Sequence, residues 1–258
     1  MTAGLRELRL SAVAGVPAIK PGDDLAGLLL RAIEDSGEGL GDGDVLVIAQ
    51  KVVSKAEGRY VALDSVQPSP EAQALAVETD KDPRLVHTIL SEARDVVRHR
   101  PGVIVVTHRL GFVMANAGID RSNLEPSDEG ERVLLLPVDP DASARALKQR
   151  FDAHAEANVA VIINDSVGRA FRTGTIGIAL GAAGLPSFQD LRGDPDMYGR
   201  TLEVSQVGLA DQLASAASLL MGEGNEAVPL VVVRGLAPMT PDLPAATLIR
   251  DPSSDLFR

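Results

Sequence analysis

Residues 159–184 read VAVIINDSVGRAFRTGTIGIALGAAG. The stretch opens with an apolar, β-branched segment at 159–163, which predicts a buried central strand. That strand runs into Asn164, Asp165 and Ser166, and five glycines follow between here and Gly184. Because the carboxyl ends of buried strands line crevices in α/β proteins, this polar triplet marks a candidate ligand site.

Strands and helices are both predicted around this stretch. Strand-like patterns occur at 6–13, 44–60, 103–107, 112–118, 133–140, 201–206 and 229–235. Helical patterns occur at 25–37, 69–98, 141–158 and 207–220. The strongest helix signals are a cap at Asp23 or Asp24, first-turn prolines at Pro70 and Pro83, and a start at Asp141 or Ser143.

The elements alternate without the regular βαβ order of a doubly wound sheet. We therefore expect an α+β (mixed α/β) fold with an irregular mixed sheet and flanking helices. The length of 258 residues fits a single domain over 1–258, built as one unit or as two intimate subdomains. The proline-rich tail after Gly235 is expected to lie on the surface.

Composition excludes several classes of protein. With no cysteine, disulfides, thiolate nucleophiles and cysteine-bound zinc are ruled out. The net charge of −11 argues against a broad nucleic-acid surface but leaves room for a small anionic ligand. No signal-peptide pattern and no apolar run of membrane-spanning length occurs, so we expect a cytoplasmic protein with no membrane partner. P-loop, G-x-S-x-G and H-E-x-x-H motifs are also absent.

Three polar constellations remain as candidates for chemistry. The first is NAGIDRSN at 116–123, either an ordinary turn with Asp120 and Asn123 bonded to local backbone, or an oxygen-rich metal or phosphate site. The second is residues 164–166 with Arg169 and Arg172, either a metal and phosphate site or a capping Asp with two solvated arginines.

The third constellation is QKVVSK at 50–55. Strand alternation would place Lys51 and Lys55 on one face with Val53, where the two ammonium groups either reach into solvent or meet a polyphosphate. Taken one at a time, the residues support only a divalent-metal and phosphate site.

Taken together, seven ordered blocks resemble the F420-0:gamma-glutamyl ligase family. They run from about residue 13 to 235 and read GVPAIKPGDDL, QKVVSKAEGR, GFVMANAGIDRSN, LLPVDPDASA, INDSVGRAFRTGTIGIALGAAGL, DPDMYGRTLEVSQVGLADQLASAASLLMG and PLVVVRG. The resemblance implies the gamma-glutamyl ligase-like fold and an intertwined homodimer. Actinobacterial members carry a further domain with flavin-binding reductase activity, and we expect that activity to be absent here. The ending DLFR nevertheless resembles the junction to such a domain.

The family's chemistry gives the expected function. Members use GTP and Mg²⁺ or Mn²⁺, with a monovalent cation as a further candidate, to phosphorylate the carboxylate of coenzyme F420-0. L-Glutamate then attacks the acyl phosphate, first through an alpha-amide bond and then through a gamma linkage, and GDP and phosphate are released. Two alternatives are a non-catalytic nucleotide- or metal-binding module of the same fold and a ligase that acts on another acid acceptor.

The resemblance also assigns roles to residues of this chain. It implies Asp120, Asp165 and Ser166 as metal ligands. It implies that Asp165, Lys55 and Arg169 are catalytic. The residues that it places around GTP are Val16, Pro17, Ala18, Ile19, Gln50, Lys55, Asn123, Met221, Gly222, Glu223 and Gly224.

Overall fold

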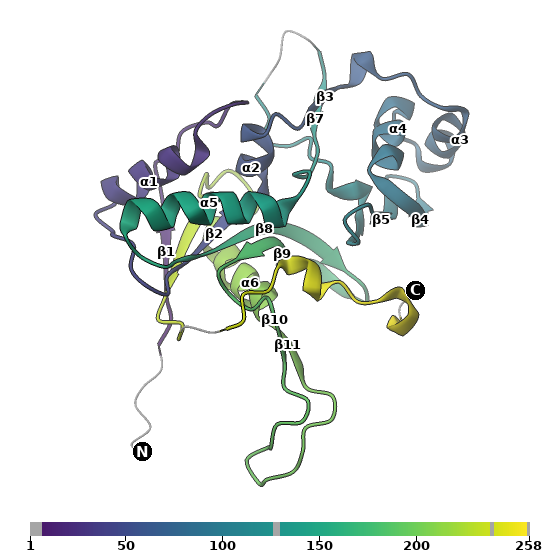
Figure 1. Cartoon of the computed structure of the whole chain (residues 1–258). Helices are drawn as coiled ribbons and strands as arrows, with labels where there is room; N and C mark the ends of the chain where they lie inside the picture. Colours follow the sequence, from purple (N-terminus) through teal and green to yellow (C-terminus); the bar gives the residue numbers. More distant parts are fainter. Residues whose placement is uncertain (1–6, 126–129, 238–239, 257–258) are drawn as a thin grey trace.

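A computed structural model describes residues 7–125, 130–237 and 240–256 of the chain (Figure 1). Its helices and strands are mixed along the sequence, which confirms the predicted α+β class. The centre is a five-stranded sheet in the order β1-β12-β2-β8-β9. Its strands are β1 (Arg9–Val13), β2 (Val45–Ala49), β8 (Ala160–Arg169), β9 (Arg172–Ala183) and β12 (Leu230–Arg234). Arg6, the first residue of the predicted N-terminal strand, lies outside the described residues.

One strand pair in the central sheet is parallel. β2 and β8 run side by side with Ala49 opposite Asn164, whereas the other neighbours in the sheet are antiparallel. β2 ends at Ala49, whereas β8 continues past this level to Arg169, so Gln50 directly follows β2 and lies beside Asp165, which is within β8. The end of β2 positions the candidate site.

Both faces of the sheet are buried. Leu46 and Ile48 of β2 face one core, together with α1 (Leu25–Asp35) and α5 (Pro140–Ala155). Val45 and Val47 face the other core, which α6 (Leu209–Met221) covers. Figure 1 shows α1 and α5 on one side of the sheet and α6 on the other. Burial on both faces explains why this strand reads as a continuous apolar run.

The predicted helices form, with shifted boundaries. Asp24 caps α1 by accepting a hydrogen bond from the Gly27 amide, as one of the two predicted caps. In α5 the cap is Asp139, followed by Pro140, so the predicted starts at Asp141 and Ser143 lie slightly too late. The Asp141 carboxylate instead accepts hydrogen bonds from the amides of Ala182, Ala245 and Ala246.

Glycines let β9 pack closely against two helices. A Cβ at Gly181 would collide with the backbone of Pro140 at the start of α5. A Cβ at Gly177 would collide with Ser218 and lie 2.6 Å from the Ala214 carbonyl, both in α6. Gly168, near the hairpin tip, has open space around it. The glycine-rich stretch is thus an antiparallel hairpin whose glycines sit mainly at helix contacts.

A smaller lobe lies beside the sheet. It contains α3 (Pro70–Thr79), α4 (Pro83–Ser91), β4 (Ala93–Arg100), β5 (Val103–His108) and β6 (Val113–Ala115), with β3 (Tyr60–Ala62) pairing with β7 (Arg132–Leu134). The lobe has its own core around Ile89 and Ile104. Pro70 and Pro83 begin their helices as predicted. The predicted helix is wrong at 93–98, because this segment pairs with β5 as part of strand β4.

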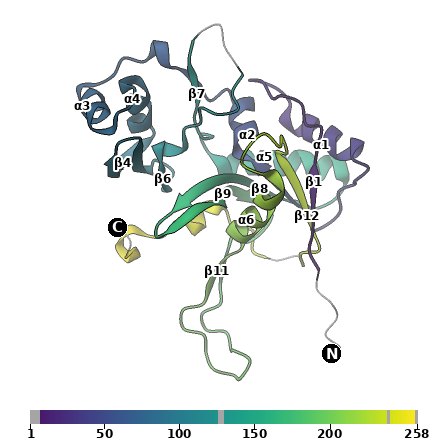
Figure 2. The ribbon, with the colours of Figure 1, turned by 180° about the vertical axis from the view of Figure 1, so that it is seen from behind.

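A hairpin arm projects from the central sheet, away from the smaller lobe (Figures 1 and 2). It is formed by β10 (Phe188–Asp190), β11 (Gln206–Gly208) and the loop between them. The predicted strand at 201–206 is therefore wrong for most of its length. The tail is also less superficial than predicted, because Ala245 is fully buried against α6 and β9. No helix in the described ranges is long and apolar enough to cross a membrane.

Candidate active site

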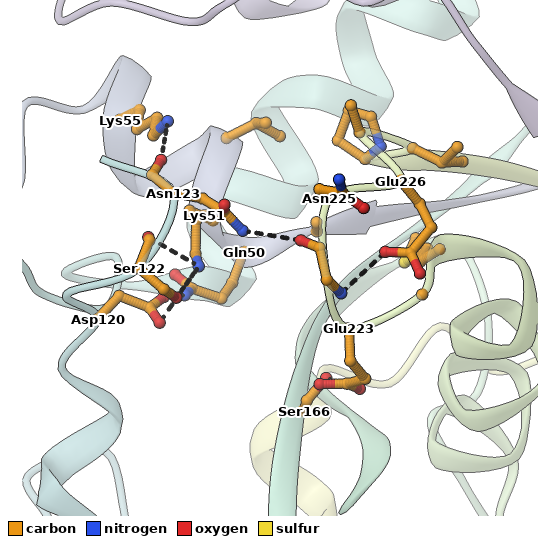
Figure 3. A pocket seen from close by; sticks show the side chains of 18 of the residues that line it. Gln50, Lys51, Lys55, Asp120, Ser122, Asn123, Ser166, Glu223, Asn225 and Glu226 are labelled. Atoms are coloured by element: carbon orange, nitrogen blue, oxygen red, sulfur yellow. Dashed lines mark hydrogen bonds and ion pairs between the residues drawn. The ribbon is translucent and has the colours of Figure 1, made fainter. Parts of the chain in front are cut away.

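A cavity of about 800 Å³ opens where β2 ends, beside residues 164–166 of β8 (Figure 3). Its walls come from five parts of the chain: the β1–α1 loop, α2 (Gln50–Ala56), the loop at 120–125, the β8–β9 hairpin, and the end of α6 with the following loop. Segments far apart in sequence therefore build one site, and its volume suits a nucleotide-sized ligand.

The segment 50–55 is a helix, so the predicted strand is wrong. The chain passes directly from Ala49 in β2 into α2. A turn follows α2, in which Gly58 has a φ of 66°. Residues four apart share a helix face, so Lys51 and Lys55 still lie together and both line the cavity. Val53 points instead into the core.

Two carboxylates, those of Asp120 and Asp165, lie in the cavity wall, and the pKa of each is raised. Partial burial, followed by the nearby charge of Asp120, raises the pKa of Asp165 to about 7. Burial also raises the pKa of Asp120, although Lys51 opposes that shift. Two acidic groups whose charges oppose each other in one pocket are typical of a site for a cation.

Lys51 and Lys55 supply positive charge close to Asp120. Lys51 Nζ lies 3.3 Å from Asp120 Oδ1 and donates to the carbonyl and hydroxyl of Ser122 (Figure 3). Lys55 Nζ donates to the Asn123 carbonyl at 2.8 Å. Burial, and then the neighbouring charge of Lys51, lowers the pKa of Lys55. A further anionic group would relieve this repulsion between the lysines.

The loop at 222–229 forms another wall and is fixed to the hairpin. Ser166 Oγ donates to Glu223 Oε1 at 2.6 Å, and the Gly224 amide donates to Glu226 Oε2 at 2.8 Å (Figure 3). Gly222 begins the loop with a φ of 72°, a conformation that favours glycine. Nearby, Val16, Ile19, Met221 and Val228 give this part of the cavity an apolar lining.

The structure brings together nearly all of the residues predicted for the site. Those that line the cavity are Val16, Pro17, Ala18, Ile19, Gln50, Lys55, Asp120, Asn123, Asp165, Ser166, Met221, Gly222, Glu223 and Gly224. Arg169 is not among the described lining residues and lies at the end of β8, opposite Arg172. Its catalytic role stays a prediction.

Several lining residues were given no role of their own from the sequence, although Lys51 and Ser122 lie in stretches that were candidates for the site. Lys51, Ser122, Thr175 and Glu226 all face the cavity. Lys51 had a usable signal, since its spacing of four from Lys55 fits one helix face. Glu226 lies in the segment 221–228, which the family resemblance places near the nucleotide, whereas Thr175 had no signal because only the folded hairpin brings it here.

The ligand set fits a divalent cation that also binds substrate. Across the described ranges, no three His, Asp or Glu side chains form a metal-binding group. Asp120 and Asp165 nevertheless supply two carboxylates whose pKa values are raised, chiefly by burial, and Ser166 supplies a hydroxyl. Mg²⁺ is commonly bound by one or two carboxylates, with water and phosphate oxygens completing its shell.

The comparison with known proteins identifies the family. Residues 15–235 match the family described as F420-0:Gamma-glutamyl ligase, and the chain belongs to it. A coenzyme F420:L-glutamate ligase from Methanopyrus kandleri is 47% identical, covering 99% of each chain. Proteins with the same name from Methanothermobacter thermautotrophicus and Archaeoglobus fulgidus are each 44% identical, covering 97% and 87% of this chain and 99% and 86% of theirs.

Proposed function

We propose that this protein is a GTP-dependent ligase that joins L-glutamate to the carboxylate of coenzyme F420-0. Family membership and the names of the relatives support the acceptor and the amino acid. The observation that carries the chemistry is the single cavity in which Asp120 and Asp165 face Lys51 and Lys55. Carboxylates that bind a cation and lysines that bind phosphate are the groups phosphoryl transfer requires.

The proposed reaction has two steps. An oxygen of the acceptor carboxylate attacks the γ-phosphorus of GTP, the bond to the β-phosphate oxygen breaks, and GDP leaves. The amine of glutamate then attacks the carbonyl of the acyl phosphate, loses a proton and expels phosphate. A second glutamate can be added through the gamma-carboxylate of the first in the same two steps.

The protein's own residues bind and orient the reactants in this scheme. Lys51 and Lys55 hold the phosphates by charge, and the apolar wall around Ile19 and Val228 receives the base. Asp120, Asp165 and Ser166 would hold Mg²⁺ or Mn²⁺, which when bound neutralises phosphate charge. We also propose a catalytic role for Arg169, at the hairpin tip, and binding of a monovalent cation. Both rest on the family resemblance, because Arg169 is not among the residues that line the cavity.

Product analysis tests this function directly. The purified chain is incubated with F420-0, L-glutamate, Mg²⁺ and either GTP or ATP, and both GDP release and the mass of the product are followed. We expect glutamate addition that depends on GTP and the acceptor, with lower kcat/KM for ATP. GDP release without a glutamylated product, or equal efficiency with ATP, would contradict this assignment.

The protein is proposed to act as a homodimer. The support beyond family membership is the projecting β10–β11 arm, on which Met197, Tyr198 and Val204 are more than 80% exposed. Such exposed apolar side chains on a projecting arm are suited to packing against a second copy. Light scattering at micromolar concentration should give twice the 27.0 kDa chain mass, and a monomer would refute the proposal.

A further inference from the structure

Gln50 sits at the first turn of α2 with both ends of its amide occupied. Its Nε2 donates to Asp120 Oδ2 at 2.8 Å, and its Oε1 accepts from Ser54 Oγ at 2.8 Å. Only 2% of Gln50 is exposed, although the residue lines the cavity. Its polar atoms therefore face protein groups, which leaves little of the side chain for direct contact with a ligand.

The hydroxyl of Ser54 has an unusual target for a residue inside a helix. The buried hydroxyls of Thr79 and Thr88 donate to the backbone carbonyls four residues earlier, Leu75 and Arg84. That is the common arrangement for Ser and Thr in helices. Ser54 is fully buried, lies outside the cavity lining, and donates instead to the Gln50 side chain.

The contacts with Ser54 and Asp120 together hold the Gln50 amide in one orientation. The Asp120 carboxylate only accepts, so it requires Nε2 of the amide, and the Ser54 hydroxyl donates to the remaining Oε1 and anchors that end of the side chain. The reverse orientation would place two oxygen acceptors against each other. Ser54 thus acts on Asp120 through Gln50.

Asp120 is held from three directions. Its backbone pairs with Leu134 through two 2.9 Å hydrogen bonds, Gln50 holds Oδ2, and Lys51 lies 3.3 Å from Oδ1. Asp120 belongs to the 120–125 loop, whereas Asp165 lies on β8. Gln50, which directly follows β2, therefore sets the loop carboxylate in position relative to the sheet carboxylate.

We propose that Ser54 and Gln50 form a positioning relay that fixes Asp120 for binding of a divalent cation. The inference rests on the proposed metal site and adds two residues to it: Gln50 as the group that orients the carboxylate, and Ser54 as the group that orients Gln50. Hydrogen-bond partners of metal ligands are worth about 10- to 100-fold in metal affinity.

Mn²⁺ binding without nucleotide tests the relay. The full chain is titrated with Mn²⁺ while electron paramagnetic resonance measures the free ion, and melting temperatures are recorded in parallel. Gln50→Met keeps the length of the side chain and removes the amide, and we expect about 10- to 100-fold weaker binding. Ser54→Ala removes one neutral hydrogen bond, and we expect roughly two- to tenfold weaker binding.

Two further variants separate positioning from general loss of stability. Thr88→Val also deletes a buried helix hydroxyl, so it should lower the melting temperature as Ser54→Ala does and leave Mn²⁺ affinity unchanged. In the double variant with Gln50→Met, adding Ser54→Ala should change Mn²⁺ affinity by less than about twofold, because Ser54 then has nothing to orient.

The outcomes separate the relay from the site on which it rests. Unchanged Mn²⁺ affinity in Ser54→Ala, or full additivity in the double variant, would overturn the relay alone if Asp120→Asn still abolishes binding. Mn²⁺ binding that is absent from the wild type, or that survives Asp120→Asn, would overturn the metal site together with the relay. Glutamate addition, measured separately, reports on the proposed function independently of both results.

Discussion

Asn123 and Gly224 lie 101 residues apart in the sequence, and the Asn123 amide donates to the Gly224 carbonyl at 3.1 Å. This hydrogen bond joins the 120–125 loop to the 222–229 loop across the cavity (Figure 3). The Lys55 ammonium holds the backbone of Asn123 from α2. The two loops are thus linked to each other and to the helix that carries both lysines.

Removing this link should weaken nucleotide binding. Asn123 has a φ of 55°, so Asn123→Gly keeps the backbone conformation and deletes only the amide. Loss of one hydrogen bond should raise the Kd for GTP by roughly two- to tenfold. Isothermal titration calorimetry measures this, and an unchanged Kd would show that the link does not order the nucleotide site.

Lys55 should contribute to turnover far more than to stability. Lys55→Met keeps most of the packing of the stem and removes the ammonium, which we expect to lower kcat/KM for GTP by about ten- to a hundredfold. Lys81→Met is a matched control, since burial lowers the pKa of that half-buried lysine as well, in the loop before α4. Equal kcat/KM values for GTP in the two variants would show that the Lys55 ammonium does not contribute to turnover.

Asp165→Asn should abolish activity while the protein stays folded. An amide keeps the size of the side chain and loses the charge that offsets a cation. Normal thermal unfolding with turnover near that of the wild type would remove Asp165 from the metal site. Circular dichroism and the glutamate-addition assay give the two measurements.

The same variant should change how stability depends on pH. The folded protein keeps a proton on Asp165 up to about pH 7, whereas the unfolded chain releases it near the ordinary pKa of 3.8. The contribution of this group to stability is therefore present at acid pH and is lost as pH rises toward 7. In EDTA, the melting temperature of Asp165→Asn should rise relative to that of wild type as pH increases across this window. Added Mn²⁺ should reduce the difference. A difference in melting temperature that stays constant with pH would contradict the prediction.

Two glycines of the opening stretch should respond differently to alanine. Gly181→Ala places a methyl group against the Pro140 backbone and should cost about 1–3 kcal/mol of stability. Gly168→Ala meets open space and has no positive φ, so it should be close to neutral. Urea unfolding of both variants compares them, and equal losses would refute the packing role of Gly181.

The parts of the fold predicted best are those where one signal dominates. Buried strands such as 45–49 and 160–163 read as apolar runs, and prolines mark the starts of α3 and α4. The sequence suggests a strand at α2 because Val52 and Val53 favour strands and come only two residues after β2. Tertiary packing decides otherwise, since only a helix turns Val53 into the core while both lysines face the cavity.

The cavity positions of Asp165, Lys51 and Lys55 were predictable, because Asp165 follows a buried apolar segment and the two lysines lie four residues apart. The hydrogen bonds between Gln50 and Asp120, and between Ser166 and Glu223, were not predictable. Each joins segments more than 50 residues apart in sequence, and no local pattern records which loop will fold back onto which. The burial of Ala245 within the otherwise exposed tail escaped prediction for the same reason, because Asp141 of α5 holds its amide.

Helix α2 should tolerate very little sequence variation. Its seven residues each have a partner in the cavity, the core or the relay: Gln50, Lys51, Val52, Val53, Ser54, Lys55 and Ala56. Helix α3, by contrast, leaves about half of its length to solvent, with Val77 84% exposed. In a library that randomises both helices, functional clones should therefore be rare for α2 and frequent at the outward positions of α3. Substitutions made to engineer this enzyme are therefore best placed outside α2, the short helix that carries Lys51 and Lys55.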